Sequence, residues 1–240
     1  MKNILEVKNL SYSFGNNPIL KDINIHVNEN EMVAIVGSSG VGKSTLFNLI
    51  AGVLKKQTGE ITIDGSNDYI GKVAYMLQKD LLFEHKTIID NVILPLIIAK
   101  VNKKEALEEG NKILKQFNLD KYANKYPQQL SGGMRQRVAL IRTYMFKRKI
   151  FLLDEAFSAL DAITKKELHK WYLDLKKGFN LTTLLITHDI EEAVFLSDRI
   201  YILGNKPGEI IGEIKIEINP NEDIDVQRLF YKKEILNIMN

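Results

Sequence analysis

The 240-residue sequence contains no cysteine, a single tryptophan, five prolines and fifteen glycines. Without cysteine, neither a disulfide framework nor a thiolate metal site can form. So little proline and glycine, together with 45% hydrophobic residues, excludes collagen-like and low-complexity disordered proteins. What remains is a globular chain that is long enough to bury a substantial hydrophobic core.

A strong excess of charge and a long hydrophobic run are also missing. Lys and Arg number 33 against 30 Asp and Glu, for a net charge of +3 with both signs interspersed, which predicts no nucleic-acid partner. The longest apolar stretch, about Val92 to Ala99, is interrupted by Pro95 and falls far short of the roughly 20 residues that a membrane span needs. The N-terminus shows no apolar signal-peptide core, so we expect a cytosolic chain that depends on a partner for any work at a membrane.

Hydrophobic patterns predict strands that alternate with helices. Residues 32–36 form a continuous apolar run, which is typical of a strand buried on both faces. Similar apolar runs recur at 73–77, 150–153, 183–186 and 199–203. Because helical patterns separate them, we expect an α/β fold with a parallel sheet covered on both faces. The β-rich start adds an antiparallel piece, and residues 86–147 are predicted to be mostly helical.

The glycine-rich loop after residues 32–36 carries the clearest chemistry. Residues 37–44 match the pattern G-x-x-x-x-G-K-[ST] between a predicted strand and a predicted helix. Such glycines let backbone N–H groups converge on an anion, and the helix N-terminus adds its positive dipole. Lys43 can then reach the β- and γ-phosphates of a nucleotide, and the Ser44 hydroxyl can bind Mg²⁺. The predicted phosphate-binding residues are Gly37, Ser38, Ser39, Gly40, Val41, Gly42, Lys43, Ser44 and Thr45.

A second feature is an apolar strand that ends in two acidic residues, Asp154 and Glu155. Acids at the carboxyl edge of a parallel sheet face the ligand crevice. We expect Asp154 to hold Mg²⁺ through water, and Glu155 to polarise an attacking water or order the catalytic groups. Taken alone, the two acids fit a strand-terminating turn or a helix cap equally well.

A third feature is a serine followed by two glycines at the start of a predicted helix. Ser131 is expected to cap this helix, while Gly132 and Gly133 leave its first backbone N–H groups bare. The stretch therefore predicts a second anion site in the same chain. An ordinary capped helix with a glycine lead-in is the alternative when the stretch is read alone.

Together these stretches resemble the ATP-binding cassette (ABC) ATPases, over about residues 4–216. The loop from Gly37 resembles the family's Walker A motif, Leu130–Gln136 its signature motif and Ile150–Glu155 its Walker B motif. The fold expected is a P-loop, RecA-like α/β core with a parallel sheet, an N-terminal antiparallel β subdomain and an inserted α-helical subdomain. The expected boundaries within one domain of residues 1–240 are 1–85 and 148–216 for the core, 86–147 for the helical subdomain and 217–240 for a short tail.

The resemblance also implies roles for residues outside these three motifs. Gln78 resembles the Q-loop glutamine, which reaches Mg²⁺ and belongs to the catalytic set with Glu155 and His188. His188 resembles the switch histidine, which binds the γ-phosphate. Asp161, in the stretch Ser158-Ala159-Leu160-Asp161, resembles the D-loop aspartate. Phe14 lies where the family stacks an aromatic ring on adenine, with Tyr12 as the alternative.

In that family two cassettes pair head to tail around two ATP molecules. Each ATP lies between the Walker A motif of one chain and the signature of the other. The resemblance thus implies that Ser131, Gly132 and Gly133 face a γ-phosphate held by a second copy, and that Asp161 packs across the pair. ATP and Mg²⁺ are the implied cofactors.

Three stretches indicate a narrower group: Tyr126–Arg137, Thr187–Ala193 and Pro207–Ile210. They are similar to importer ATPases of the nitrate, sulfonate and taurine group, which includes importers of thiamine-precursor pyrimidines. The resemblance implies a peripheral subunit on the cytoplasmic side of the cell membrane, held by integral membrane permease subunits and served by an extracytoplasmic solute-binding protein. A soluble non-transport ABC ATPase, or a subunit of an exporter or lipoprotein-releasing system, is the alternative.

The partner surface is expected between Lys79 and about Leu96, including Leu81, Leu82 and Phe83. There a short coupling helix of the permease would enter a groove beside Gln78. Ordinary packing of the helical insertion is the alternative. Residues 79–86 also depart from the group's usual pattern, and the sequence leaves the solute open.

Overall fold

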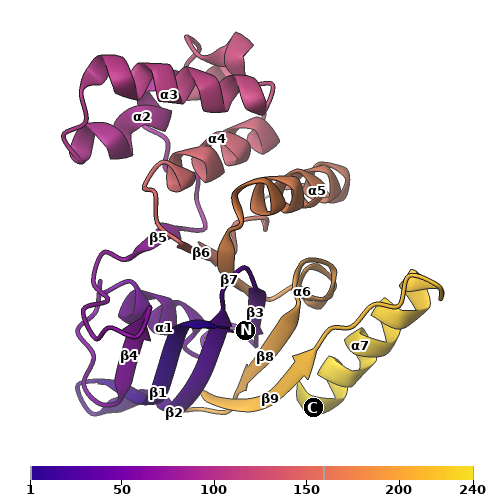
Figure 1. The fold of residues 1–240 in the computed structure, drawn as a ribbon. Helices are drawn as coiled ribbons and strands as arrows, with labels where there is room; N and C mark the ends of the chain where they lie inside the picture. The colour runs from indigo at the N-terminus through magenta and orange to yellow at the C-terminus, as the bar shows by residue number, and fades with distance from the viewer. Residues whose placement is uncertain (1, 159, 240) are drawn as a thin grey trace.

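The computed structural model describes residues 2–158 and 160–239, which form two sheets and seven α-helices (Figure 1). The smaller sheet is antiparallel and has the order β2 (Asn17–Asn28), β1 (Asn3–Phe14) and β4 (Glu60–Ile63). The larger sheet has the order β5 (Val73–Met76), β6 (Ile150–Asp154), β7 (Thr182–Thr187), β3 (Met32–Val36), β8 (Arg199–Gly204) and β9 (Glu209–Lys215). Its first five strands run parallel and β9 is antiparallel. The predicted fold class is confirmed.

The central strands are buried because both faces of the larger sheet are covered. Along β6, Phe151 and Leu153 point into a core shared with α2 (Ile88–Ile98), α4 (Gly132–Tyr144) and α5 (Ala162–Phe179). Ile150 and Leu152 point into a second core shared with the antiparallel sheet and α1 (Lys43–Ile50). Successive side chains of a strand point to opposite faces, so a continuous apolar run was needed here.

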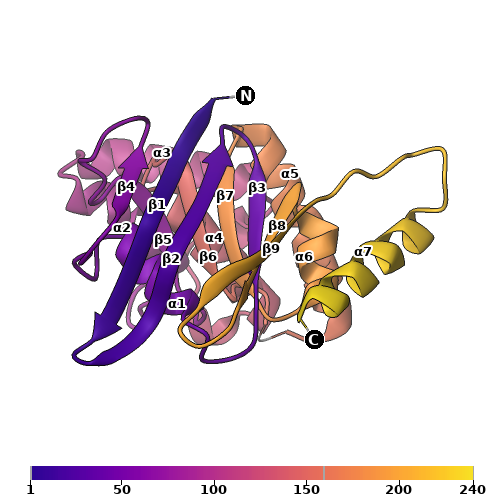
Figure 2. The ribbon, with the colours of Figure 1, turned by 90° about the horizontal axis from the view of Figure 1, so that it is seen from below.

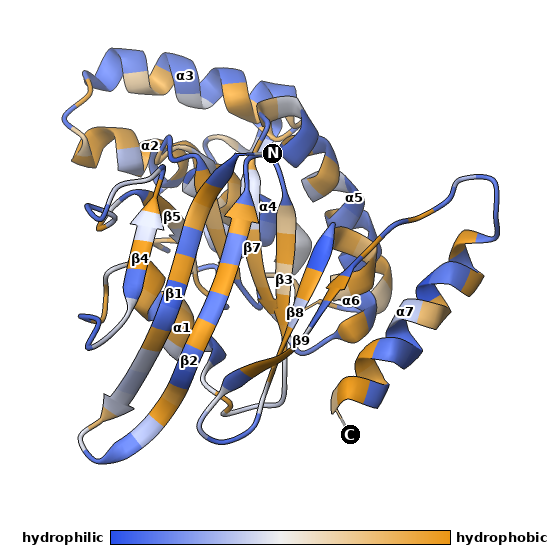
Figure 3. Ribbon diagram, turned by 60° about the horizontal axis from the view of Figure 1, so that its bottom comes forward, coloured by the Kyte–Doolittle hydropathy of each residue, from blue (hydrophilic) through white to orange (hydrophobic). Residues whose placement is uncertain are grey.

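The antiparallel sheet has only one buried face. Along β1 and β2 the ribbons of Figure 3 alternate between hydrophilic and hydrophobic residues. That alternation is the pattern expected of a half-buried sheet. The buried side lies on the core that also contains α1, so the hairpin of β1 and β2 packs next to the glycine-rich loop.

Three helices lie between residues 88 and 144: α2, α3 (Lys103–Gln116) and α4. Thr87 caps α2 by accepting a hydrogen bond from the Asp90 N–H, and Ser131 caps α4 by accepting one from the Met134 N–H. At Gly110 of α3 an added Cβ would lie 2.5 Å from Ile93 of α2, so the two helices approach closely. These helices fall inside the segment predicted as a helical subdomain, whose boundaries stay a prediction.

The last two helices lie beside the far edge of the larger sheet. Figure 2 shows α7 (Ile224–Met239) alongside α6 (Ile190–Leu196). Of the α7 side chains, Ile235 is fully buried, whereas Val226 and Phe230 are 62% and 63% exposed. Most of the predicted tail is therefore a helix, with much of its apolar surface uncovered. Within residues 2–158 and 160–239, no helix combines the length and apolar character needed to cross a membrane.

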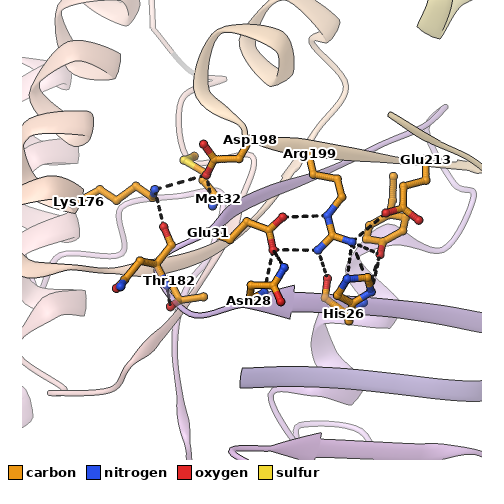
Figure 4. Close-up of polar contacts among 11 residues, drawn as sticks. His26, Asn28, Glu31, Met32, Lys176, Thr182, Asp198, Arg199 and Glu213 are labelled. Carbon is orange, nitrogen blue, oxygen red and sulfur yellow. Dashed lines mark hydrogen bonds and ion pairs between the residues drawn. The ribbon is translucent and has the colours of Figure 1, made fainter. Parts of the chain in front are cut away.

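A buried arginine joins the two sheets at the amino ends of β3 and β8 (Figure 4). Arg199 donates from Nε and Nη2 to the two carboxylate oxygens of Glu31, at 2.9 and 2.8 Å. It also donates to Glu213 and the Tyr201 hydroxyl, both at 2.8 Å, and to the carbonyl of His26 at 2.9 Å. Burial alone would raise the pKa of Glu31, but the hydrogen bonds from Arg199 and Asn28, together with the charge of Arg199, outweigh it and lower that pKa.

Candidate active site

The glycine-rich loop lies between β3 and α1, and its geometry demands glycine. An added Cβ at Gly37 would lie 2.3 Å from the carbonyl oxygen of Leu203 on β8. At Gly42, where φ is +109°, it would lie 2.7 Å from Leu20 on β2. Strands β8 and β2 thus pack closely against the loop and leave room only for glycine at these positions. A tightly curled glycine-rich loop at a helix start lets backbone N–H groups converge on an anion.

Lys43 begins α1 and is only 6% exposed. Its ammonium group donates to the carbonyl oxygens of Gly37 (2.8 Å) and Ser38 (2.9 Å). Burial lowers the pKa of Lys43, while the nearby charges of Glu155 and Asp154 act in the opposite direction. The site therefore holds a buried cation on neutral oxygens, and an anionic ligand would satisfy it far better.

Asp154 ends β6 next to this loop and is 7% exposed. It accepts a hydrogen bond from the Tyr75 hydroxyl at 3.2 Å and another from Ser44. Burial raises the pKa of Asp154, and the hydrogen bonds from Ser44 and Tyr75 only partly offset it. The hydroxyl and carboxylate oxygens predicted for Mg²⁺ are thus neighbours, and the nearby charge of Lys43 lowers the pKa of the carboxylate too little to offset its burial.

Three predicted catalytic residues meet at the carboxyl ends of β5, β6 and β7. The Gln78 side chain donates to one oxygen of Glu155 at 3.0 Å, and Nδ1 of His188 lies 3.2 Å from the other. The three strands are adjacent in the sheet, so the residues that follow them converge. Glu155 has φ +47°, a strained value for a residue with a side chain, and its N–H is held by the Ile186 carbonyl.

The second predicted anion site lies elsewhere in the chain. Gly133 packs on the start of α5, where an added Cβ would lie 2.5 Å from Thr164. Asp161 caps α5 and accepts hydrogen bonds from two of its backbone N–H groups, at 3.1 Å. Among the described residues no hydrogen bond or ion pair joins 131–133 to 37–45, and Figure 1 shows α4 and α1 well apart. Ala159, in the predicted D-loop, lies outside the described residues.

The two candidate adenine-stacking rings differ sharply in exposure. Phe14 is 51% exposed and Tyr12 only 8%, with the two rings in an edge-to-face contact of 5.0 Å between centroids. Phe14 ends β1, opposite Asn17 of β2, and the next residues of β2 contact Gly42. Of the two rings, Phe14 offers a free face near the glycine-rich loop.

Two arginines of α4 bind the segment that follows Gln78, a link that the sequence did not predict. Arg135 pairs with the Asp80 carboxylate at 3.2 Å, and Arg142 donates to the carbonyl oxygens of Leu81 (2.8 Å) and Asp80 (2.5 Å). The only signal was their spacing of seven residues, which places both on one face of a helix. Through them the segment after β5 is fastened to the helix that carries Gly132 and Gly133.

An apolar groove of about 300 Å³ lies over this fastened segment, between β5, α2 and α4. Its lining includes Leu81, Phe83, Pro95 and Arg142. Leu81 and Phe83, predicted to line a partner surface, are 52% and 43% exposed. Leu82, predicted for the same surface, is instead 7% exposed and belongs to the hydrophobic core, so for this residue the alternative of ordinary packing holds.

The glycine-rich loop, the buried lysine and the paired acids of this α/β sheet define the class of P-loop nucleotide hydrolases. A family model described as ABC transporter matches residues 20–158. The formylaminopyrimidine import ATP-binding protein ThiZ of Halalkalibacterium halodurans is 38% identical, over 98% of this chain and 96% of its own. The nitrate import ATP-binding protein NrtD of Synechocystis sp. is 37% identical, over 94% and 87%.

The fold has the same relatives. A solved ATP-binding cassette, described as dimeric and in a post-hydrolysis state with ADP and Pi, superposes with a TM-score of 0.74 at 33% identity. The match covers 90% of this chain and 100% of that one. The chain belongs to the ABC transporter family, and it is an ATP-binding and ATP-hydrolysing protein. Its relatives include the importer group that the sequence motifs indicated.

Proposed function

We propose that this chain is the ATPase subunit of a membrane importer and works as a head-to-tail pair of copies. The separation of the two anion sites carries this proposal. Lys43 and its loop bind an anion at one place, while the bare helix start at Gly132 and Gly133 lies in another part of the chain. Pairing two copies head to tail makes each site complete, because the signature of one copy closes the nucleotide held by the other.

Within each site the residues divide the work on ATP and water. Lys43 leaves the carbonyls of Gly37 and Ser38 and binds the β- and γ-phosphates. Glu155 accepts a hydrogen bond from the attacking water, and His188 binds the γ-phosphate. Glu155 already contacts His188 and Gln78, so the water-positioning group and the phosphate-binding group are set relative to each other before ATP arrives.

The oxygens near Lys43 suit magnesium. The Ser44 hydroxyl and the Asp154 carboxylate are hard oxygen ligands, and Gln78 uses its amide N–H group on Glu155, which leaves its carbonyl oxygen free. Bound Mg²⁺ supplies charge that stabilises the phosphates during hydrolysis. It would also relieve the cost of keeping Asp154 ionised in a buried place.

The groove beside Gln78 is the proposed contact with integral membrane permease subunits. Exposed Leu81, Phe83 and Ile98 offer it an apolar surface that fits a short helix of the permease. The chain would then sit on the cytoplasmic side of the cell membrane, with an extracytoplasmic solute-binding protein delivering the solute. The importer relatives favour a small anionic or organic solute such as nitrate, a sulfonate or a thiamine precursor.

Two experiments test these parts separately. The variant Ser131→Arg should bind ATP as the wild type does but fail to form the ATP-dependent dimer, measured by size-exclusion chromatography with light scattering. An unchanged dimer would contradict the head-to-tail arrangement.

Recovery of the tagged chain from gently solubilised membranes of its host should yield a permease. Recovery only with soluble partners would contradict the proposed importer role.

A further inference from the structure

A second large cavity lies away from the nucleotide site. It measures about 610 Å³ and is enclosed by α5, α6 and α7. Its apolar lining includes Val194 and Phe195 of α6 and Leu229 of α7. Arg228 of α7 lies over the Phe195 ring, 4.6 Å from its centroid. The last helix therefore forms the outer wall of a cavity that is both apolar and charged.

The acidic residues of this lining are already paired. Asp189 caps α6 and lies 2.8 Å from the ammonium group of Lys165. Glu192, which is buried, lies 3.0 Å from His169, and Glu191 pairs with Lys232 of α7. These carboxylates have no need of a cationic ligand.

Three basic residues of the lining, Lys166, Lys170 and Arg228, have weaker ion pairs or none. Within residues 2–158 and 160–239, no hydrogen bond or ion pair involves the ammonium groups of Lys166 and Lys170 on α5. Arg228 has one ion pair, at 3.6 Å with the highly exposed Asp225, and its Nε is buried without a hydrogen-bond acceptor. The uncommitted charge around the cavity is thus positive, and one buried donor lacks a partner.

The cavity also borders two segments of the catalytic machinery. Asp189 in its lining directly follows His188, which contacts Glu155. Leu160 and Ala162, also in the lining, flank Asp161. A ligand that joined α5 to α7 here would therefore stiffen the supports of both segments.

From this arrangement we infer that the cavity is an effector site for a small organic anion, one that joins a phosphate or carboxylate to a ring or short hydrocarbon. The oxyanion lies between Lys166, Lys170 and Arg228, and the apolar part packs on Phe195 and Leu229. Binding changes the rate of ATP hydrolysis through Asp189 and the segment before α5. This site is independent of the importer role and of any permease.

The test uses phenyl phosphate as the probe and the full chain saturated with ADP, so that the phosphate loop is occupied. Calorimetry should detect binding of phenyl phosphate to the wild type. The double variant Lys166→Gln/Lys170→Gln should bind it at least about fivefold more weakly, since two charge contacts are lost. The double variant Lys112→Gln/Lys115→Gln removes the same charge from α3, which does not line the cavity, and should bind as the wild type does.

Three binding results and one kinetic result would contradict the inference. Binding that is equal in both double variants would remove the lysines from the site. Binding that is seen without ADP but is absent from the ADP-saturated chain would place the probe on the phosphate loop. Equal binding of neutral benzyl alcohol would leave a purely apolar cavity. For the effector role, phenyl phosphate should alter hydrolysis at saturating ATP in the wild type and not in Lys166→Gln/Lys170→Gln. An unaltered wild-type rate would contradict that role.

Discussion

The two ends of the parallel strands β3, β6, β7 and β8 differ in how well their buried charged groups are paired. At the amino ends, Arg199 donates hydrogen bonds to Glu31, Glu213, Tyr201 and His26. At the carboxyl ends, Lys43 rests on neutral carbonyls, and burial raises the pKa of Asp154. At the first end the charges are paired within the folded chain. At the second, the charged groups are the ones that we propose bind ATP and Mg²⁺.

This difference separates a structural polar network from the one that we propose to be catalytic. A buried charge whose hydrogen-bond and ion-pair partners are all present costs little folding free energy, and it has no group left to bind a ligand. A buried charge without them costs folding free energy, which ligand binding later returns. Substitutions at the amino ends should therefore lower stability, whereas substitutions at the carboxyl ends should lower ATP hydrolysis or ATP binding.

The largest effect is expected at the carboxyl ends, from Glu155→Gln. Loss of the water-positioning carboxylate should reduce ATP hydrolysis about 1,000-fold, while ATP binding persists and the ATP-bound dimer accumulates. Phosphate release under saturating ATP measures hydrolysis, and light scattering measures the ATP-bound dimer. Hydrolysis at the wild-type rate would show that Glu155 is not the catalytic carboxylate.

At the amino ends, Arg199→Met should lower the free energy of unfolding and leave ATP hydrolysis by the folded protein unchanged. It leaves Glu31 buried without a cation, which costs about 3–4 kcal/mol of the free energy of unfolding. Urea denaturation measures this loss. The double variant Glu31→Gln/Arg199→Met should recover part of it, and a double variant no more stable than Arg199→Met would contradict the pairing.

Lys43→Ala should weaken ATP binding about 100-fold, because a charge-assisted contact to the phosphates is lost. Calorimetry with ATP measures it. Lys55→Ala, which removes an exposed lysine shortly after α1, is the matched control and should bind normally. Equal affinities in the two variants would remove the phosphate-loop assignment.

Acid should distinguish the two ends by the sign of its effect on stability. The pKa of Glu31 is lowered, so its contribution is present above its ordinary value of 4.5 and is lost as pH falls through the folded value. The pKa of Asp154 is raised above 3.8, so the ionised carboxylate costs stability at neutral pH, and this cost fades as pH falls. Asp154→Asn should therefore raise Tm at pH 7, and Glu31→Gln should lower it.

Both differences should shrink toward pH 4, measured by thermal unfolding across the pH range. Asp154→Asn should also lose magnesium-dependent hydrolysis. An unchanged or lower Tm for Asp154→Asn at pH 7 would mean that the buried carboxylate is not a cost to the fold.

The smallest expected effect concerns the two aromatic rings near the loop. Phe14→Ala should weaken ATP binding by about 1 kcal/mol, the size of one stacking contact, and leave phosphate release otherwise intact. Tyr12→Phe should bind ATP as the wild type does, because Tyr12 is buried under Phe14. The reverse result would assign the stacking role to Tyr12.

Much of the site was predictable because it follows from chain order. The loop at residues 37–45 has a pattern that fixes its chemistry, and residues after adjacent parallel strands must meet, as Gln78, Glu155 and His188 do. The fold class followed from apolar runs of strand length between helical patterns. The loop and the fold class needed only neighbouring residues and the rules of parallel sheets. Gln78 and His188 were singled out by the resemblance to ABC ATPases, and the adjacent strands explain why they meet Glu155.

What the sequence left open depends on side chains that meet from distant positions. Arg142 lies 61 residues from Leu81, and no periodicity predicts that its guanidinium would reach that carbonyl. The Tyr75 hydroxyl on Asp154 depends on the register of two strands, which a list of apolar runs does not give. Leu82 was a candidate for the partner surface together with Leu81 and Phe83, and composition alone cannot tell which side chain of such a run turns inward.

The way Arg142 fastens the segment at residues 80–81 bears on how such a protein diversifies. Its guanidinium binds the main-chain carbonyls of Asp80 and Leu81, which every amino acid carries. Leu81 can therefore be exchanged without loosening that attachment. If the groove binds a permease as we propose, its side chains can change one substitution at a time to fit a new partner, while the backbone connection to α4 is kept.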